Sequence, residues 1–227
     1  MTASGTTSRK GRLVCLVGMD GSGKSTLARA LRATLEERGL RCRYVYGGFT
    51  SSFTVLRPVV GLARATLFRG ERHYEDSQTK GRALKNTTLS TLYQYLALAD
   101  YILQSTYRIR LPLALGWNVV CDRYIYDLAV GIGVLLDYPT ARILSLLRRC
   151  LPVLPRPHLI FLLDLPESLA YQRKDDIVSL DFLKARREVY LEMARCHEIP
   201  VLDASASPEQ LHKVITEQVL RLIEGKA

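Results

Sequence analysis

The sequence has few residues that could build a metal centre or a disulfide framework. It contains five cysteines, no two of which are spaced as a C-x-x-C pair, and its four histidines are equally scattered. An odd, scattered set of cysteines with apolar neighbours is typical of buried, reduced thiols. We therefore expect no structural zinc, buried free thiols and a cytoplasmic location.

Long uninterrupted apolar runs are also missing. No stretch of about 18 uncharged apolar residues occurs, which is the length that a membrane-spanning helix needs. The first dozen residues, MTASGTTSRKGR, are polar and lack the apolar core of a secretory signal. We expect residues 1–12 to form a flexible tail, with no spanning helix after it.

Acidic residues are outnumbered by basic ones. The chain has 32 Lys and Arg against 22 Asp and Glu, which gives a formal net charge of +10. Such an excess favours anionic partners, namely nucleotides, nucleic acid or a membrane surface. No interleaved aromatic and basic motif accompanies the charge, so we do not expect specific binding to nucleic acid.

Five short apolar runs are each about the length of a strand, and segments long enough for helices separate them. Near-continuous apolar strands that alternate with helices indicate a parallel sheet covered on both faces. The sequence therefore predicts a three-layer α/β fold, with a single domain over residues 13–227. The runs are Leu13–Gly18, Arg41–Tyr46, Asn118–Asp122, His158–Asp164 and Ile199–Asp203.

The interval of about 50–115 has no clear strand. Two stretches within it, FTVLRPVVGLARATLFRG and LSTLYQYLALADYILQSTY, repeat apolar residues at spacings of three and four. We interpret them as a helical region beside the sheet. The first stretch is also basic, so it could touch a membrane surface. A core helix with exposed arginines is the simpler interpretation of the same pattern.

A glycine loop, GMDGSGKST, lies between the first apolar run and a helix-like segment. It fits G-x-x-x-x-G-K-[ST] at Gly18, Gly23, Lys24 and Ser25. Gly21 and Gly23 let backbone N–H groups approach phosphate oxygens without a Cβ clash. Lys24 can supply charge to the β- and γ-phosphates, and the Ser25 hydroxyl can bind Mg²⁺. We expect Lys24 to lie in a solvated loop, so that its loss would abolish turnover without unfolding the protein.

Two further motifs follow strands. In WNVVCDRYIYD an apolar strand ends in Asp122 and Arg123, which could hold Mg²⁺ opposite Ser25 and reach a phosphate. In PHLIFLLDLPESLAYQRKDD a strand leads into a helix that ends in Arg173 and Lys174. Cations at that place could cover a phosphate chain, so we expect a short lid over about residues 166–180.

These motifs, in this order, resemble those of thymidylate kinases. The resemblance rests on GMDGSGKST, DRY, LDLPESLAYQR and IPVLDAS, and it runs from about Leu13 to Asp203. It implies a P-loop kinase fold with a five-stranded parallel sheet and helices on both faces. It also implies transfer of the γ-phosphoryl group of ATP, with Mg²⁺, to an acceptor phosphate, with dTMP as the default acceptor. A homodimer is a further implication.

The resemblance also implies roles for individual residues. The catalytic residues would be Lys24, Arg123 and Arg173, and the metal ligands Ser25 and Asp122. The glycine loop would bind the ATP phosphates, and the loop after the last strand would lie near the adenine. The implied ATP-binding residues are Gly18, Asp20, Gly21, Ser22, Gly23, Lys24, Ser25, Thr26, Asp203 and Ala204.

The acceptor side departs from the family pattern. Thymidylate kinases usually place an arginine after the second strand, but here the strand runs into YVYGGFTSSF. They also tend to have an Asp-Arg pair on the helix over the acceptor base, where this chain has Asp100 and Tyr101. Two arginines that would hold a nucleoside monophosphate are therefore missing. The acceptor-binding residues that we expect are Phe49, Arg57, Tyr93, Asp100, Tyr101 and Arg123.

Three functions remain open on this basis. The first is a dTMP kinase whose acceptor phosphate is held by other cations, from among Arg57, Arg82, Lys85 and Arg123. The second is a kinase with a different phosphorylated acceptor. The third is an ATP-binding regulatory or membrane-surface protein with slow turnover. A nucleoside hydroxyl is a less expected acceptor, because no acid that could take its proton occurs between Val45 and Leu56.

Overall fold

The computed structural model describes residues 10–48, 87–173 and 180–225, and within these ranges five strands form one parallel sheet. Their order is β2-β3-β1-β4-β5, and every neighbouring pair is parallel. The five-stranded parallel sheet is therefore confirmed. The strands are β1 (Leu13–Gly18), β2 (Cys42–Tyr46), β3 (Asn118–Asp122), β4 (Leu159–Asp164) and β5 (Val201–Asp203).

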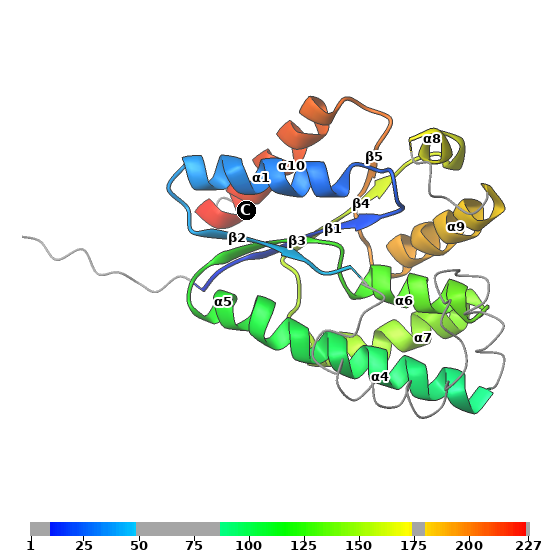
Figure 1. Cartoon of the computed structure of the whole chain (residues 1–227). Helices are drawn as coiled ribbons and strands as arrows, with labels where there is room; N and C mark the ends of the chain where they lie inside the picture. The colour runs from blue at the N-terminus through cyan, green and yellow to red at the C-terminus, as the bar shows by residue number, and fades with distance from the viewer. Residues whose placement is uncertain (1–9, 49–86, 174–179, 226–227) are drawn as a thin grey trace, which may run out of the picture.

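Helices cover both faces of this sheet (Figure 1), which confirms the three-layer arrangement. α1 (Lys24–Glu37) and α10 (Pro208–Glu224) pack together on one face. The other face carries α4, α6 and α7, with α9 packed beside α6 and α7. The remaining described helices are α4 (Thr87–Ser105), η1 (Thr106–Arg110), α5 (Leu111–Ala114), α6 (Ile125–Leu135), α7 (Thr140–Cys150), η2 (Leu151–Val153), α8 (Glu167–Gln172) and α9 (Leu180–Cys196).

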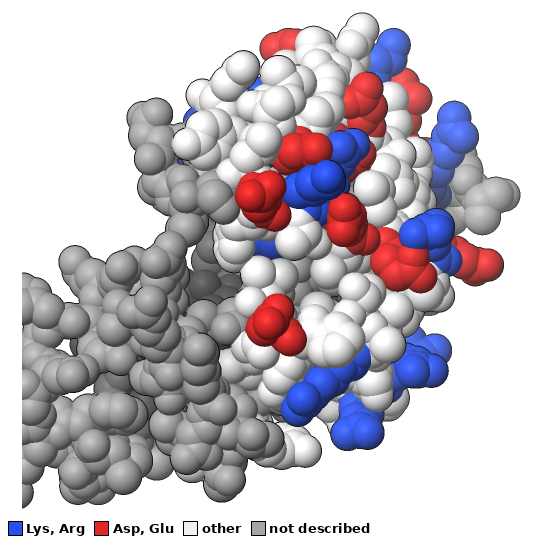
Figure 2. Space-filling view, turned by 90° about the vertical axis from the view of Figure 1, so that its right-hand side faces the viewer, with Lys and Arg blue, Asp and Glu red and all other residues white. Residues whose placement is uncertain are grey.

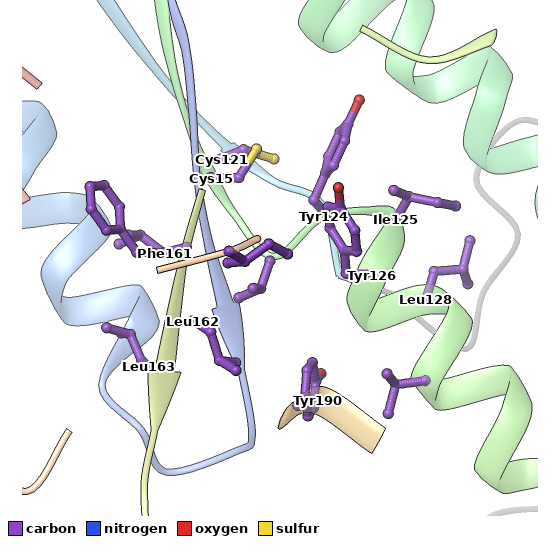
Figure 3. Close-up of a cluster of buried hydrophobic side chains, with 14 of the residues drawn as sticks. Cys15, Cys121, Tyr124, Ile125, Tyr126, Leu128, Phe161, Leu162, Leu163 and Tyr190 are labelled. Carbon is purple, nitrogen blue, oxygen red and sulfur yellow. The ribbon is translucent and has the colours of Figure 1, made fainter. Parts of the chain in front are cut away.

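The core lies on both sides of the central strands. All six residues of β1 are buried, as expected for a strand with a helical layer on each face. In β4, Phe161 and Leu163 point toward α1, while Leu162 points to the side of α6 (Figure 3). Full burial of one such side chain contributes about 1.5–3 kcal/mol. These strands therefore hold their carboxyl ends in fixed positions.

The five cysteines are all free thiols. Cys15, Cys42, Cys121 and Cys150 are buried, as the sequence led us to expect. Cys196 is exposed, so the prediction of a buried thiol is wrong at that position. Cys196 is the last residue of α9, where it follows the exposed Arg195 at the end of the helix.

The chain is already anchored to the sheet before β1. The Gly11 N–H donates to the carbonyl of Leu113 (3.1 Å), and the Arg12 N–H donates to Oδ1 of Asn118 (3.0 Å). Gly11 is buried. The predicted tail of residues 1–12 is therefore too long at its end, because residues 11 and 12 pair with the segment that leads into β3.

Gly11 is needed for this close approach. A Cβ at that position would lie 1.7 Å from the carbonyl oxygen of Trp117. We expect Gly11→Ala to push the two segments apart and to lower the free energy of unfolding by about 1–3 kcal/mol, as overpacking does. Urea denaturation of the purified variant measures this loss.

Gly131→Ala is the matched control. Gly131 lies within α6, and a Cβ there would meet no atom within 4 Å. Because alanine favours a helix over glycine by up to about 1 kcal/mol, this variant should be as stable as the wild type or more so. Equal unfolding midpoints for the Gly11→Ala variant and the wild type would contradict the packing argument.

Candidate active site

The glycine loop joins the end of β1 to the start of α1, and its shape depends on glycine. Gly18, Gly21 and Gly23 have φ angles of 140°, 84° and 84°, which L side chains rarely adopt. A Cβ on Gly18 would also lie 2.5 Å from the carbonyl oxygen of Leu163. No side chain caps the first turn of α1. Its N–H groups and the positive end of the helix dipole are thus suited to an anion.

Lys24 is the first residue of α1, and only 3% of it is exposed. The expectation that it lies in a solvated loop is therefore wrong. Its ammonium group curls back over the loop and donates to the carbonyl of Met19 and to Oγ of Ser22 (3.3 Å). Burial, with a smaller contribution from the charge of Arg123, lowers the pKa of Lys24 to about 8. The loop holds this cation in place before any phosphate arrives.

Asp122 is fully buried at the end of β3, beside the loop. Its Oδ2 accepts a hydrogen bond from the Tyr44 hydroxyl (2.7 Å). Its Oδ1 is buried and has no hydrogen-bond partner among the described residues. A buried carboxylate oxygen without a partner is costly. This free oxygen therefore fits a role in the shell of a Mg²⁺ ion.

Few of the described side chains are arranged so that they could bind a metal ion. In the described ranges no group of three or more His, Cys, Asp and Glu side chains is arranged to bind one. Mg²⁺ that arrives with a nucleotide needs only one or two protein ligands, because phosphates and waters supply the others. Ser25, in the first turn of α1, and Asp122 meet that smaller requirement.

Tyr44 on β2 orients Asp122, and sequence reasoning did not identify it. Burial, together with the carboxylate of Asp122, raises the pKa of Tyr44 to about 12. Its hydroxyl therefore remains a donor at neutral pH. The guanidinium of Arg29 on α1 lies 5.7 Å from the centre of the Tyr44 ring. Only the parallel pairing of β2 with β3 brings Tyr44 near Asp122, so no local motif could have revealed this contact.

Arg123 links the glycine loop to α6. Its φ angle is 71°, and its backbone N–H donates to the carbonyl of Leu16 (2.8 Å). Its guanidinium pairs with the carboxylate of Asp20 in the loop, and it lies 3.5 Å from Oδ1 of Asp127. The side chain is 15% exposed. Arg123 is therefore held rigidly beside the loop, where the sequence placed a phosphate-binding cation.

Asp127 is a second carboxylate that sequence reasoning missed. It forms a capping box at the start of α6, in which Oδ2 accepts from the N–H of Tyr124 (3.1 Å). Its Oδ1 accepts from the hydroxyl of Tyr190 (2.8 Å) on α9. The spacing in DRYIYD, with an acid three residues after the helix cap, was the available signal. Asp127 thus fixes α6, α9 and Arg123 relative to one another.

The carboxylate of Asp20 forms ion pairs with two arginines. Besides Arg123, Nη1 of Arg186 on α9 lies 3.1 Å from its Oδ2. Burial acts to raise the pKa of Asp20, but the charges of Arg123, Arg186 and Lys24 outweigh it and lower the pKa to about 2. The carboxylate therefore stays ionised. The sequence assigned Asp20 to ATP binding, which stays a prediction, while the structure directs its side chain toward α6 and α9.

Arg173 lies on the opposite side of the loop. Its Nη1 is 3.5 Å from the carbonyl oxygens of both Gly21 and Ala204. The structure thus brings together the glycine loop, the end of α8 and the segment after β5, three parts assigned to ATP from the sequence. The carboxylate of Asp203 is exposed and accepts from the N–H of Ser205 (2.8 Å). Lys174 lies outside the described residues.

The predicted acceptor residues are only partly placed. Asp100 is buried on α4, and its Oδ2 accepts from Nε2 of Gln104 (2.6 Å). Tyr101 is also buried, and its ring centre lies 6.2 Å from that of Tyr124, edge to face. Residues 49 and 57 and the basic stretch 53–72 lie outside the described residues, as does the side chain at position 93. Acceptor binding by Phe49, Arg57, Tyr93, Asp100 and Tyr101 stays a prediction.

Arg187 fixes α9 against the sheet. Its guanidinium contacts both carboxylate oxygens of Asp164 at 2.8 and 2.9 Å, and Oε2 of Glu167 at 2.8 Å. Paired N–H donors on one carboxylate give a well-defined geometry. This contact sets the position of Arg186, the next residue along the helix. The Arg-Arg pair in KARREVY was present in the sequence, but nothing local showed which carboxylates it would meet.

The face that carries α8 and α9 mixes charges of both signs. In Figure 2, Lys and Arg side chains lie next to Asp and Glu side chains across the described part of this face. The net charge of +10 is therefore not gathered there into one basic field.

A phosphate-binding loop at the end of the central strand, with an Asp-Arg pair ending the next strand, is the plan of a P-loop kinase. Residues 72–215 match the family described as thymidylate kinase. The chain therefore belongs to the thymidylate kinase family, a family of nucleotide kinases.

Curated relatives extend the similarity to the glycine loop. A probable thymidylate kinase of Methanosarcina acetivorans is 26% identical over 231 residues, which span 95% of this chain and 98% of the relative. One from Pyrococcus abyssi is 29% identical and covers 95% and 99%. A thymidylate kinase of Symbiobacterium thermophilum is 29% identical and covers 91% and 90%.

The buried charge of Lys24 predicts a measurable dependence of stability on pH. Its folded-state pKa of about 8 lies below the usual 10.5, so between these values the unfolded chain binds more protons and stability rises with pH. A shift of this size corresponds to about 3 kcal/mol. We therefore expect the unfolding free energy of the wild type, minus that of Lys24→Met, to increase by about this amount from pH 8 to 10.5.

Lys24→Met is the suitable variant, because methionine keeps most of the buried volume, whereas alanine would leave a cavity. The contributions of the other titrating groups to the unfolding free energy are the same in both proteins, so they cancel when one unfolding free energy is subtracted from the other. Denaturant unfolding at several pH values gives both curves. A difference that is flat across this range would show that Lys24 titrates normally and is not desolvated as the structure indicates.

Proposed function

We propose that this protein transfers the γ-phosphoryl group of ATP to a nucleoside monophosphate, with dTMP as the first candidate acceptor. The observation that carries the proposal is the convergence of Lys24, Asp122 and Arg123 around one anion-binding loop. Phosphoryl transfer needs this combination, because catalysis consists mainly of positioning and of neutralising charge. The relatives named as thymidylate kinases support dTMP as the acceptor.

The donor side is supported by the loop and its surroundings. The N–H groups at the start of α1 and the ammonium of Lys24 would bind the β- and γ-phosphates. Arg173, between Gly21 and Ala204, would lie along the phosphate chain. The segment after β5 would then lie near the adenine. This assignment groups Arg173, the glycine loop and the segment after β5 around the donor nucleotide.

Ser25 and Asp122 are the residues that would hold Mg²⁺. When bound with ATP, this ion neutralises charge between the β- and γ-phosphates. The Tyr44 hydroxyl occupies Oδ2 of Asp122 and leaves Oδ1 free for this use. Tyr44 is thus a positioning residue, because it fixes the carboxylate without contacting the nucleotide.

In the transfer step an oxygen of the acceptor phosphate forms a bond to the γ-phosphorus while the bond from that phosphorus to the ADP oxygen breaks. Negative charge builds up on the transferring oxygens, and fixed cations stabilise it. Arg123 is rigid and close to the loop, so it suits this task. The ammonium of Lys24 would stay in contact with the γ-phosphoryl group while that group moves from ATP to the acceptor.

A different phosphorylated acceptor is the second candidate, and one observation favours it. Gly47 and Gly48 occupy the place after β2 where the family usually has an arginine, so the acceptor side of this chain departs from the family pattern. Assembly as a homodimer and a cytoplasmic location stay predictions. Among the described residues we find no helix with both the length and the apolarity that a membrane crossing requires.

Consumption of ATP with each nucleoside monophosphate, with nucleosides and with a few phosphorylated lipids tests the proposal. We expect turnover with a pyrimidine monophosphate, with dTMP the best of dTMP, dUMP, CMP and UMP. Lys24→Met should lower kcat by about 10³-fold, because a charge that stabilises the transition state is lost. Turnover with no monophosphate above the level of this variant would refute the proposal.

The metal role of Asp122 predicts a split between two nucleotide affinities. Asp122→Asn keeps the size of the side chain but removes its charge. We expect affinity for Mg²⁺-ATP to fall by at least about 10-fold, the cost of a charged contact, while affinity for ATP in EDTA changes less. Tyr44→Phe, which removes only the orienting hydroxyl, should show a smaller loss of the same kind. Equal losses with and without Mg²⁺ would argue against this role.

A further inference from the structure

The two described positions after β2, Gly47 and Gly48, leave no room for a cation. A Cβ on Gly47 would lie 2.6 Å from the carbonyl oxygen of Arg123 and 2.9 Å from Sγ of Cys121. A Cβ on Gly48 would lie 2.5 Å from Cδ of Arg123. An arginine at either position would displace Arg123 itself. A cation that binds an acceptor phosphate must therefore come from a position other than these two.

The contacts of the glycine loop form two groups, and the helices that make them, α8 and α9, also pack against each other. In the first group are α8 and the segment after β5, which Arg173 connects to the loop through Gly21 and Ala204. In the second group the carboxylate of Asp20 points to Arg123 and to α9. Tyr124 follows Arg123 and packs against α4, the helix that carries Asp100. The first group suits the donor nucleotide, so the second group is left for the acceptor.

Arg186 is a buried cation in this second group. Its side chain is 11% exposed, and its Nη1 lies 3.1 Å from Oδ2 of Asp20. Its Nε is buried and has no hydrogen-bond partner among the residues that the structure describes. Arg187, one residue further, ties the same helix to Asp164 at the end of β4. Arg186 is thus fixed by a rigid element and still has an unused donor.

Asp20 is shared between the guanidinium groups of Arg123 and Arg186, and Asp127 is a second counter-charge to Arg123. The side chain of Asp20 is 26% exposed, more than that of Arg123 at 15% or Arg186 at 11%. Solvent therefore reaches this carboxylate more easily than it reaches the cations. A phosphate can accept charge-assisted hydrogen bonds from guanidinium groups, as the carboxylate of Asp20 does here.

We propose that Arg186, together with Arg123, binds the phosphate of the acceptor, and that Asp20 holds both guanidinium groups in position before the acceptor arrives. This inference rests on the proposed phosphoryl transfer to a monophosphate. It identifies the cation that replaces the arginines missing from the family pattern. It also explains why a second arginine lies buried beside a loop that already contains Lys24.

The test compares the affinities of dTMP and thymidine, measured by calorimetry without ATP. In the wild type the phosphate should make dTMP bind much more tightly than thymidine. Arg186→Gln should reduce the ratio of these two affinities by about 10–100-fold, the value of one or two charge-assisted hydrogen bonds. If Arg186 has only a structural role, the substitution should weaken the binding of dTMP and of thymidine by the same factor, and the ratio of the two affinities should not change.

Kinetics provide the second measurement. In Arg186→Gln the KM for dTMP should rise by at least about 10-fold, while the KM for ATP stays within about twofold. Arg195→Gln is the control, because Arg195 is on the same helix and its side chain is 76% exposed. It should behave as the wild type in both assays. If the Gln variant does not fold, Arg186→Lys is the alternative, because lysine keeps the charge but lacks the paired N–H donors of a guanidinium group. It should lower the ratio of the dTMP and thymidine affinities by several-fold.

The results separate this inference from the proposed function. A wild type that phosphorylates dTMP, with a variant whose affinity ratio is unchanged, would overturn the role of Arg186 alone. A rise in the KM for ATP as large as the rise in the KM for dTMP would place Arg186 on the donor side. That result would also overturn the role of Arg186 in acceptor binding. A wild type that phosphorylates no monophosphate would overturn both proposals.

Discussion

The parallel pairing of β1 with β3 places Leu16 opposite Asp122, so the segments that leave the two strands begin at the same edge of the sheet. The hydrogen bond from the N–H of Arg123 to the carbonyl of Leu16 continues that pairing by one residue (2.8 Å). Asp122 and Arg123 therefore cannot move relative to the glycine loop unless the central strands separate. Because those strands are buried on both faces, this separation would require disruption of the core.

The buried charges next to this edge depend on one another. Lys24, Arg123 and Arg186 are each nearly buried, and each would be costly without a counter-charge. Asp20 and Asp127 provide that counter-charge, and Asp127 also caps α6. The same side chains thus stabilise the fold and hold these cations beside the glycine loop. Preorganisation of this kind reduces the reorganisation that a transition state requires.

The local patterns in the sequence predicted the frame of this site well. Apolar runs between helix-length segments located all five strands to within two residues. The signal is strongest for β1 and β3, because a strand buried on both faces must be apolar throughout. The spacing of Gly18, Gly23, Lys24 and Ser25 located the loop, since its backbone geometry needs glycine at fixed places. Asp122 and Arg123 follow a strand directly, so their position at the sheet edge could also be predicted.

The sequence by itself therefore determined the fold class, the family and the position of the glycine loop, because each depends on neighbours in the chain. Only the tertiary structure decided that Lys24 is buried, that Tyr44 orients Asp122 and that Arg186 lies at the loop. These contacts join residues separated by up to 166 positions, and the sheet register and the packing of α9 bring them together. A charge pattern such as the Arg-Arg pair of α9 has many possible partners, and only the packed fold selects Asp20 for one arginine and Asp164 for the other.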